Sequence, residues 1–290
     1  MNRPLITNVY SREESNVIAF GVILGRKAAE SVNAIRDASW FIETFDIISK
    51  RNLLERAKVY DIGDIKLASY DDLENITKTA SSILSEGKLP LILGGGHLAT
   101  YYALKAMPKD VVLVVFDAHC DLRESYIDEK IIELDYINEN VVVDKKLNDA
   151  TWLRWASEET LFKKAVVLGV RSGDEEQLVY AKKKGILLIT SEKLLSKNGL
   201  GVTIKTLSTL TKGKKVYLSL DIDVFDPSIA PAVDHPEPPG ISFREFAKLV
   251  RSIKGRIIGC DVVCLRKIPN NEVTEFLAAR AIFEILSHAT

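Results

Sequence analysis

Short apolar runs alternate along the chain with stretches that have the apolar period of an amphipathic helix. The strand-like runs cover residues 17–24, 89–93, 111–116, 165–170, 186–190, 216–220 and 256–264. The helical periods cover residues 28–48, 99–106, 175–184, 242–253 and 272–287. Strands that alternate with helices in this way are typical of a parallel sheet covered on both faces. We therefore expect an α/β fold of three layers, α/β/α, with a mostly parallel sheet.

The whole chain, residues 1–290, is expected to form a single domain, because no linker or internal repeat interrupts this rhythm. Proline and glycine gather in residues 227–240, which predicts a rigid excursion that forms part of a pocket wall. Residues 123–148 are charged and only loosely periodic. A connection of that length is more often a lid or a specificity loop than part of the scaffold.

Side chains that can bind a metal ion follow three of the strand-like runs. They are His97, behind three glycines; Asp117, His119 and Asp121; and Asp221 and Asp223. Because ligands bind at the carboxyl ends of the strands in open parallel sheets, these side chains are expected to converge. The two-residue alternation of an extended chain predicts that the middle three point toward one place and the last two toward another nearby.

Four carboxylates in a dry crevice need positive charge beside them, since burying them uncompensated is too costly. Two divalent ions would supply that charge. Oxygen ligands with two imidazoles suit manganese, although cobalt, nickel, iron and zinc stay open. Two such ions can share a water, lower its pKa and present hydroxide to an electrophilic carbon. For any single cluster, the alternative is that the acids cap helices or form turns and the histidines lie in the core.

Composition excludes several classes of partner. The chain of 290 residues has 39 basic and 40 acidic residues, so it lacks the long-range field that attracts nucleic acid or an anionic membrane. No signal core is present at the N-terminus, and no apolar run approaches the roughly 20 residues that span a bilayer. Three cysteines form no disulfide framework. We expect a cytoplasmic protein that binds neither nucleic acid nor membrane.

The chain resembles the ureohydrolase family of arginases, agmatinases and formimidoylglutamases. The resemblance covers most of the sequence and is most specific at Asp-Ala-His-Cys-Asp, residues 117–121, and at residues 219–227. It implies an arginase-like fold and a homo-oligomer, either a trimer or a hexamer. It also implies two manganese ions in each subunit. One would be bound by His97, Asp117, Asp121 and Asp221, and the other by Asp117, His119, Asp221 and Asp223, with Asp117 and Asp221 bridging.

Departures from the family pattern concern the substrate. The Gly-Gly-Gly-His form of residues 94–97 and the sequence Asp-Leu-Arg at 121–123 look more like the formimidoylglutamase branch. Arg123 is a candidate to bind a substrate carboxylate through its planar guanidinium, with a solvated position on the loop as the alternative. Arg154 and His235 are further candidates for substrate contact, and an exposed loop position is the alternative for His235.

Two family groups are missing. Residues 148–154 contain no histidine where arginases and agmatinases carry a His-Gly-Thr-Pro-like element. Asp149 is a candidate acid or base in its place, with a turn role as the alternative. The family's Asp-Val-Val-Glu element ends here in Cys264, and a neutral thiol contributes little to holding a cation. Glu272 or Glu275 would have to reach in from downstream, whereas both fit the polar face of the closing helix.

These observations predict a binuclear manganese hydrolase that cleaves a carbon–nitrogen bond of a small linear amidine or guanidine. The metals and Asp121 would orient the attacking hydroxide. A formimino acid is the first substrate hypothesis, and arginine, agmatine and other guanidino compounds are the others. Two alternatives stay open: a deacetylase-like enzyme with one zinc ion, and a metal-binding relative that lost activity when Cys264 replaced the glutamate.

Overall fold

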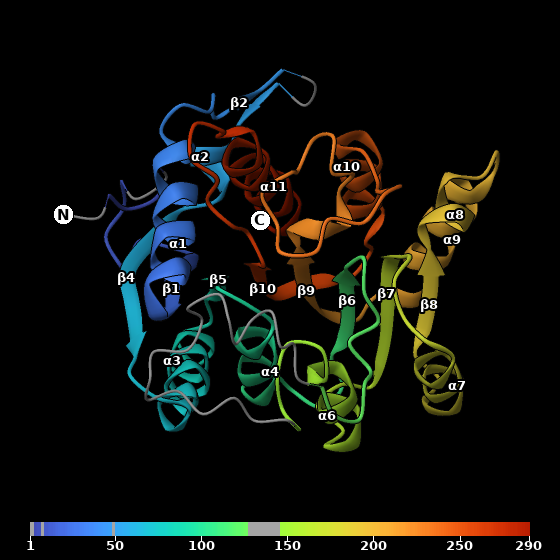
Figure 1. The fold of residues 1–290 in the computed structure, drawn as a ribbon. Helices are drawn as coiled ribbons and strands as arrows, with labels where there is room; N and C mark the ends of the chain where they lie inside the picture. The colour runs from blue at the N-terminus through green and yellow to red at the C-terminus, as the bar shows by residue number, and fades with distance from the viewer. Residues whose placement is uncertain (1–2, 7–8, 48–49, 127–145) are drawn as a thin grey trace.

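A parallel sheet of eight strands forms the centre of the molecule in a computed structural model (Figure 1), which describes residues 3–6, 9–47, 50–126 and 146–290. The order across the sheet is β4-β1-β5-β10-β9-β6-β7-β8, and each neighbouring pair runs parallel. The strands are β1 (Val17–Leu24), β4 (Val59–Leu67), β5 (Leu89–Leu93), β6 (Val112–Phe116), β7 (Lys164–Val170), β8 (Leu187–Thr190), β9 (Lys215–Asp221) and β10 (Arg256–Val263). A separate antiparallel pair joins β2 (Phe45–Asp46) to β3 (Arg51–Asn52).

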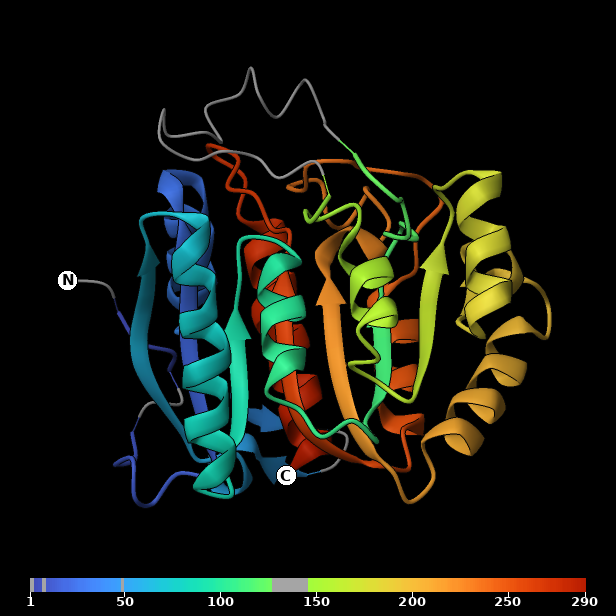
Figure 2. The same cartoon turned by 90° about the horizontal axis from the view of Figure 1, so that it is seen from below.

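Helices cover both faces of the sheet, so the predicted three-layer α/β/α fold is confirmed (Figures 1 and 2). One layer contains α3 (Glu74–Ser85), α4 (Leu98–Lys105), α6 (Trp152–Glu158) and α7 (Glu175–Lys184). The other contains α1 (Gly25–Ser39), α2 (Leu53–Arg56), α8 (Ser191–Leu195), α9 (Gly199–Thr211), α10 (Phe243–Ser252) and α11 (Val273–Ala289). Two short 3-10 turns, η1 (Tyr70–Leu73) and η2 (Ile222–Val224), follow β4 and β9.

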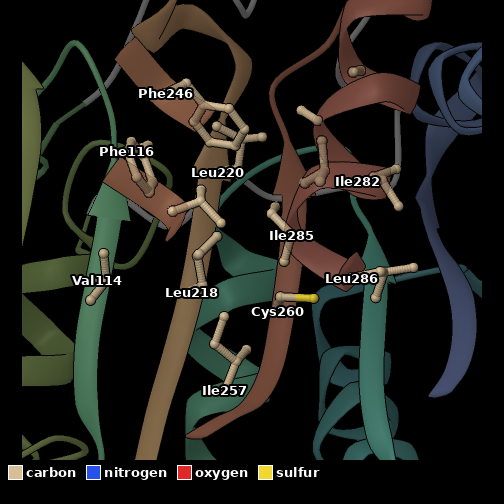
Figure 3. Close-up of a cluster of buried hydrophobic side chains, with 14 of the residues drawn as sticks. Val114, Phe116, Leu218, Leu220, Phe246, Ile257, Cys260, Ile282, Ile285 and Leu286 are labelled. Atoms are coloured by element: carbon tan, nitrogen blue, oxygen red, sulfur yellow. The ribbon is translucent and has the colours of Figure 1, made fainter. Parts of the chain in front are cut away.

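The strands β5 and β6 are apolar along their whole length because both of their faces are covered. Every residue of β5 and β6 is buried. On one face, Phe116 and Leu220 meet Phe246 of α10, and Cys260 faces α11 (Figure 3). The rings of Phe116 and Phe246 lie edge to face with centroids 5.0 Å apart. This packing holds the carboxyl ends of the central strands in fixed positions.

The N-terminal part departs from the sequence prediction. The helical period at residues 28–48 ends as α1 at Ser39, and Phe45 already belongs to β2. The apolar residues beyond the helix are largely exposed, and the Phe41 ring lies 6.3 Å from the Phe276 ring of α11. Periodicity alone overestimated the helix because the apolar spacing continues beyond Ser39, although most of these side chains stay exposed and do not pack on the sheet. Most of the predicted lid, residues 127–145, lies outside the described residues.

The last strand of the sequence occupies the middle of the sheet. β10 pairs with β5 on one side and with β9 on the other. The carboxyl ends of β5, β10, β9 and β6 therefore lie in a row, and the chain segments that follow them meet above that edge. Among the described residues, no helix is both long and apolar enough to cross a membrane.

Candidate metal centre and its cavity

The side chains predicted to bind metal gather above the carboxyl ends of β5, β6 and β9. His97, which directly precedes α4, places its Nε2 atom 3.1 Å from Asp117 Oδ2 and 3.0 Å from Asp221 Oδ2. The same nitrogen is 3.7 Å from Asp121 Oδ2. Three segments far apart in the sequence thus supply one compact group of nitrogen and oxygen donors.

A second donor group lies beside the first and shares Asp117 with it. His119 Nδ1 is 2.8 Å from Asp223 Oδ2 and 3.5 Å from Asp117 Oδ1. Backbone amides orient these carboxylates: Asp223 accepts a hydrogen bond from the amide of Ala118, and Asp221 accepts one from the amide of Asp223. The aspartates are therefore held in place by the backbone at the strand ends.

Burial opposes charge throughout this cluster. Burial and neighbouring carboxylates raise the pKa of Asp121 and Asp221 well above the ordinary value. Burial also acts to raise the pKa of Asp117, but its hydrogen bonds with His119 and His97 outweigh that effect and the pKa is lowered. For the imidazoles burial lowers the pKa, yet the carboxylates raise it well above 6.5 for His97 and to about 12 for His119.

This donor set fits two divalent cations. Four carboxylates face two imidazoles, so the cluster is short of positive charge unless cations enter it. Two groups of donor atoms each lie within 4.8 Å of one another, His97 with Asp117 and Asp121, and Asp117 with His119 and Asp223. Because carboxylate oxygens with imidazole nitrogens suit manganese among other divalent metals, the residues fit the metal that the family resemblance implies.

The alternation expected for residues 117–121 was partly wrong. Asp121 turns toward His97, whereas His119 turns toward Asp223 on the other side of Asp117. The physical reason is that β6 ends at Phe116, so the two-residue period of a strand no longer applies. Asp121 itself has a left-handed backbone with φ of 51°.

Hydrogen bonds behind the donors orient them, and sequence reasoning missed most of these partners. The Trp152 ring lies parallel to the His97 ring with centroids 4.8 Å apart, and its Nε1 donates to Asp121 Oδ2 at 2.7 Å. The other ring nitrogen of His97, Nδ1, lies 3.2 Å from Thr100 Oγ1. Of these partners, only Thr100 could have been predicted from the sequence, because it lies three positions after His97 and helical residues three apart share a face.

A buried chain of polar groups continues from this contact. Thr100 Oγ1 is 3.3 Å from Ser219 Oγ, which donates to Asp261 Oδ1 at 2.7 Å. Tyr217 donates to the other oxygen of Asp261 at 2.7 Å. These hydrogen bonds connect His97, which follows β5, to β9 and β10. The orientation of the imidazole therefore depends on these three neighbouring strands.

Arg171, which follows β7, fixes the segment after β9. Its guanidinium donates to the carbonyl oxygen of Asp223 at 2.6 Å and to those of the next two residues. It also donates to the carbonyl of Glu237 in the proline-rich excursion. Burial lowers the pKa of Arg171. The excursion and the aspartate-bearing turn are thereby joined by one side chain, which no motif in the sequence had indicated.

A cavity of about 350 Å³ opens beside the donor groups. Its other charged or reactive lining side chains are Cys120, Arg123, Asp149, Asp234, His235, Glu237, Cys264 and Arg266. The residues from 234 to 237 belong to the proline-rich excursion, so part of that segment does line the cavity. Arg266 forms a close ion pair with Asp234, at 2.5 Å.

The proposed substrate contacts are distributed unequally. Arg123 lines the cavity and pairs with Asp174 at 3.0 Å, and the ring of His235 lies 5.9 Å from that of His119. Arg154 is not among the lining residues. Its guanidinium instead pairs with Glu176 at 2.9 Å and lies over the Tyr180 ring of α7. The structure therefore does not bring Arg154 to the site.

Asp149 lies directly beside the segment that carries His97. Its Oδ1 accepts a hydrogen bond from the amide of Leu98 at 3.0 Å, at the first residue of α4. A Cβ atom at Gly96 would lie 2.2 Å from Asp149 Oδ2, so only glycine permits this approach. Asp149 also lines the cavity. Its carboxylate thus combines a structural contact with a position from which it can meet a ligand.

Cys264 directly follows β10 and faces the donor groups. Its sulfur, His97 and Asp221 form a third set of donor atoms that lie within 4.8 Å of one another. Burial and the nearby charge of Asp221 raise the pKa of Cys264 well above its usual value. Glu275 was expected on the polar face of the closing helix, and this was wrong, because the residue is 2% exposed and lies on the buried side of α11. It does not line the cavity either.

Comparisons with known proteins agree with this architecture. An agmatinase from Bacillus anthracis is 29% identical over 95% of this chain and 92% of its own. A guanidinobutyrase from Pseudomonas aeruginosa is 30% identical over 87% of this chain and 77% of its own. The crystal structure of agmatine ureohydrolase from Thermoplasma volcanium matches with a TM-score of 0.83 at 28% identity, over 99% of this chain and 94% of that one.

A formimidoylglutamase from Bacillus subtilis matches with a TM-score of 0.81 over 96% of this chain and 88% of that one. At 22% identity this likeness shows the fold alone, so it does not favour the formimidoylglutamase branch. The family model described as "Arginase family" matches residues 25–287. With the fold and the donor groups above, this match shows that the chain belongs to the arginase family.

Proposed function

We propose that this protein is a binuclear manganese hydrolase that cleaves the carbon–nitrogen bond of a small linear guanidino compound. The observation that carries the proposal is the gathering of two imidazoles and four carboxylates at one end of the cavity. Two overlapping donor groups suit two ions, which distinguishes this function from that of a deacetylase with one zinc ion. Manganese, when bound by these residues, would lower the pKa of a water molecule so that it becomes a nucleophile at neutral pH.

The protein residues position the water and the substrate. Asp121, oriented by Trp152, is placed to accept a hydrogen bond from the attacking water and then to take up its proton. Attack on the planar guanidino carbon followed by loss of the amine produces urea, and the leaving nitrogen gains one proton. His235 lies on the cavity wall near His119 and is our candidate to contact the leaving amine.

Asp149 is our candidate to hold the guanidinium group. Cys264, which stands where the resemblance implies a glutamate, provides no charge for that task. Asp149 lines the same cavity, and its charge lies close enough to Cys264 to contribute to raising the pKa of that thiol. A carboxylate from another segment thus lies close to the position that lacks one, and a carboxylate pairs well with a planar guanidinium.

The tail of the substrate decides between two classes of compound. The names of the agmatinase relatives and the carboxylate of Glu237 in the lining favour a cationic tail, as in agmatine. Arg123 in the lining favours a carboxylate tail, as in guanidinobutyrate or a formimino acid. We place agmatine first because both arginines of the lining already have carboxylate partners: Arg123 pairs with Asp174, and Arg266 pairs with Asp234.

The test is an assay of the manganese-loaded protein against agmatine, guanidinobutyrate, arginine and N-formiminoglutamate, with the bound metal counted. We expect two ions in each chain and urea release, which is fastest from agmatine. Asp221→Asn should lose metal and turnover. Asp110→Asn is the control, because this aspartate is exposed on the surface. One bound zinc would favour a deacetylase, whereas two ions without turnover of any compound would favour an inactive relative.

A further inference from the structure

A sulfur donor, that of Cys264, lies beside only one of the two donor groups, the group that contains His97. The group of His119, Asp117 and Asp223 offers nitrogen and oxygen only. On the other side, Cys264 joins His97 and Asp221 in a set of three different donor types within 4.8 Å. A site with imidazole, carboxylate and thiolate ligands has a different metal preference from one without sulfur.

The position of the sulfur is built by the centre of the sheet. Cys264 continues β10 between the ends of β5 and β9, and its amide donates to the carbonyl of Gly95 at 3.2 Å, two residues before His97. The residue lines the cavity and is only half-buried, so an ion in the cavity can reach it. The segments that carry the nitrogen donor and the sulfur donor are thus hydrogen-bonded to each other.

The distances suit a shared ion. Typical bond lengths are about 2.0–2.1 Å from zinc to nitrogen and about 2.3 Å to sulfur, so two ligands of one ion lie at most about 4.4 Å apart. Donor atoms that already lie within 4.8 Å of one another need only a small side-chain adjustment to meet that limit. The other cysteines do not form part of such a set: Cys260 lies in the apolar core (Figure 3), and no donor group of the described residues includes Cys120.

We propose that Cys264 is a further metal ligand and that it makes the two metal sites unequal. The site of His97, Asp221 and Cys264 binds thiophilic divalent metals such as zinc, iron or cobalt in preference to manganese, while the sulfur-free site has a weaker preference for them. When the sulfur binds, the thiol loses one proton to solvent and bonds as the thiolate. This inference rests on the proposed function in that it requires the same binuclear centre.

The test uses cobalt as a spectroscopic probe in the full-length protein. Cobalt(II) is titrated into the metal-free protein, and the absorption and the number of ions bound are recorded together. We expect a sulfur-to-cobalt charge-transfer band that reaches its full intensity with one of two ions. The band should disappear in Cys264→Ser, which keeps the size of the side chain. It should persist in Cys260→Ala, which removes the buried cysteine of β10, four residues earlier.

Metal competition provides a second readout. Cys264→Ser should weaken zinc binding at one site by at least about tenfold. Loss of a hydrogen-bond partner of a metal ligand already costs roughly that much, and loss of the ligand itself should cost more. Manganese binding at the other site should not change. Two bound cobalt ions without a charge-transfer band, or a band that survives in Cys264→Ser, would overturn the inference and leave the proposed function intact. Binding of fewer than two ions by the unaltered protein would instead overturn the binuclear function itself.

Discussion

Trp152 offers a test of whether groups outside the donor set control metal binding. Its indole nitrogen donates to Asp121, and its ring lies parallel to that of His97. The substitution Trp152→Phe keeps an aromatic ring against the imidazole and removes only the hydrogen bond and part of the ring area. The side chain is fully buried, so water cannot easily replace the missing donor.

The expected loss follows from that single contact. A hydrogen bond to a charged acceptor contributes about 1.5–3 kcal/mol. At about 1.4 kcal/mol for each factor of ten, this corresponds to a roughly 10- to 100-fold weaker affinity for the ion beside Asp121. The same range is typical when an outer partner of a metal ligand is lost. Isothermal titration of the metal-free protein with manganese would measure it.

The matched control is Trp155→Phe in the same helix. Trp155 donates its indole hydrogen to the backbone carbonyl of Lys146 and does not contact the donor groups. This variant should bind both ions as the unaltered protein does. Equal metal affinities for Trp152→Phe and the unaltered protein, both folded by circular dichroism, would refute the reasoning, because the hydrogen bond would then contribute nothing to binding.

Three further predictions concern stability and positioning. Arg36→Met should lower the free energy of unfolding in urea by about 3–5 kcal/mol, because it removes the guanidinium that pairs with the buried carboxylates of Asp61 and Asp64. Arg12→Met, at the more exposed pair with Glu86, should cost less than about 1 kcal/mol. Burial raises the pKa of Glu275 above 4.5 in the folded protein. The contribution of the protonated side chain to stability is therefore complete below pH 4.5 and is lost as the pH rises through the pKa of the folded state. Urea unfolding measured across this pH range should show a smaller decline for Glu275→Gln. Gly96→Ala should displace the neighbouring carboxylate of Asp149 and reduce kcat/KM by about 100-fold with an unchanged far-ultraviolet spectrum. Equal stability of the two arginine variants, a pH profile that does not change, or full activity of the alanine variant would contradict the respective argument.

The sequence was sufficient for the layers and for the residues that converge. The strand-like runs that end near Leu93, Phe116 and Leu220 correspond to β5, β6 and β9, because strands buried on both faces are mostly apolar. The side chains that follow such strands in a parallel sheet meet at one edge whatever the order of the strands. The six predicted donors could therefore be assigned to one site without knowledge of the topology. They are His97, Asp117, His119, Asp121, Asp221 and Asp223.

The partners of those residues could not be predicted in the same way. Trp152 is one apolar residue of a short helix, and Arg171 follows a strand as many basic residues do. Their roles depend on distances across the fold, which no local period encodes. Asp149 is similar, since its contact with the start of α4 exists only because the chain returns to that point after a long connection.

The central place of β10 has a consequence for how the protein is made. Without this strand, β4-β1-β5 and β9-β6-β7-β8 are separate half-sheets, and β5 and β9 each present an open edge. A nascent chain on the ribosome keeps both edges exposed until residues 256–263 have emerged, and open strand edges invite pairing with other chains. During translation, the vulnerable period thus lasts until β10 has left the ribosome, and it is before then that chaperones should bind this chain most strongly.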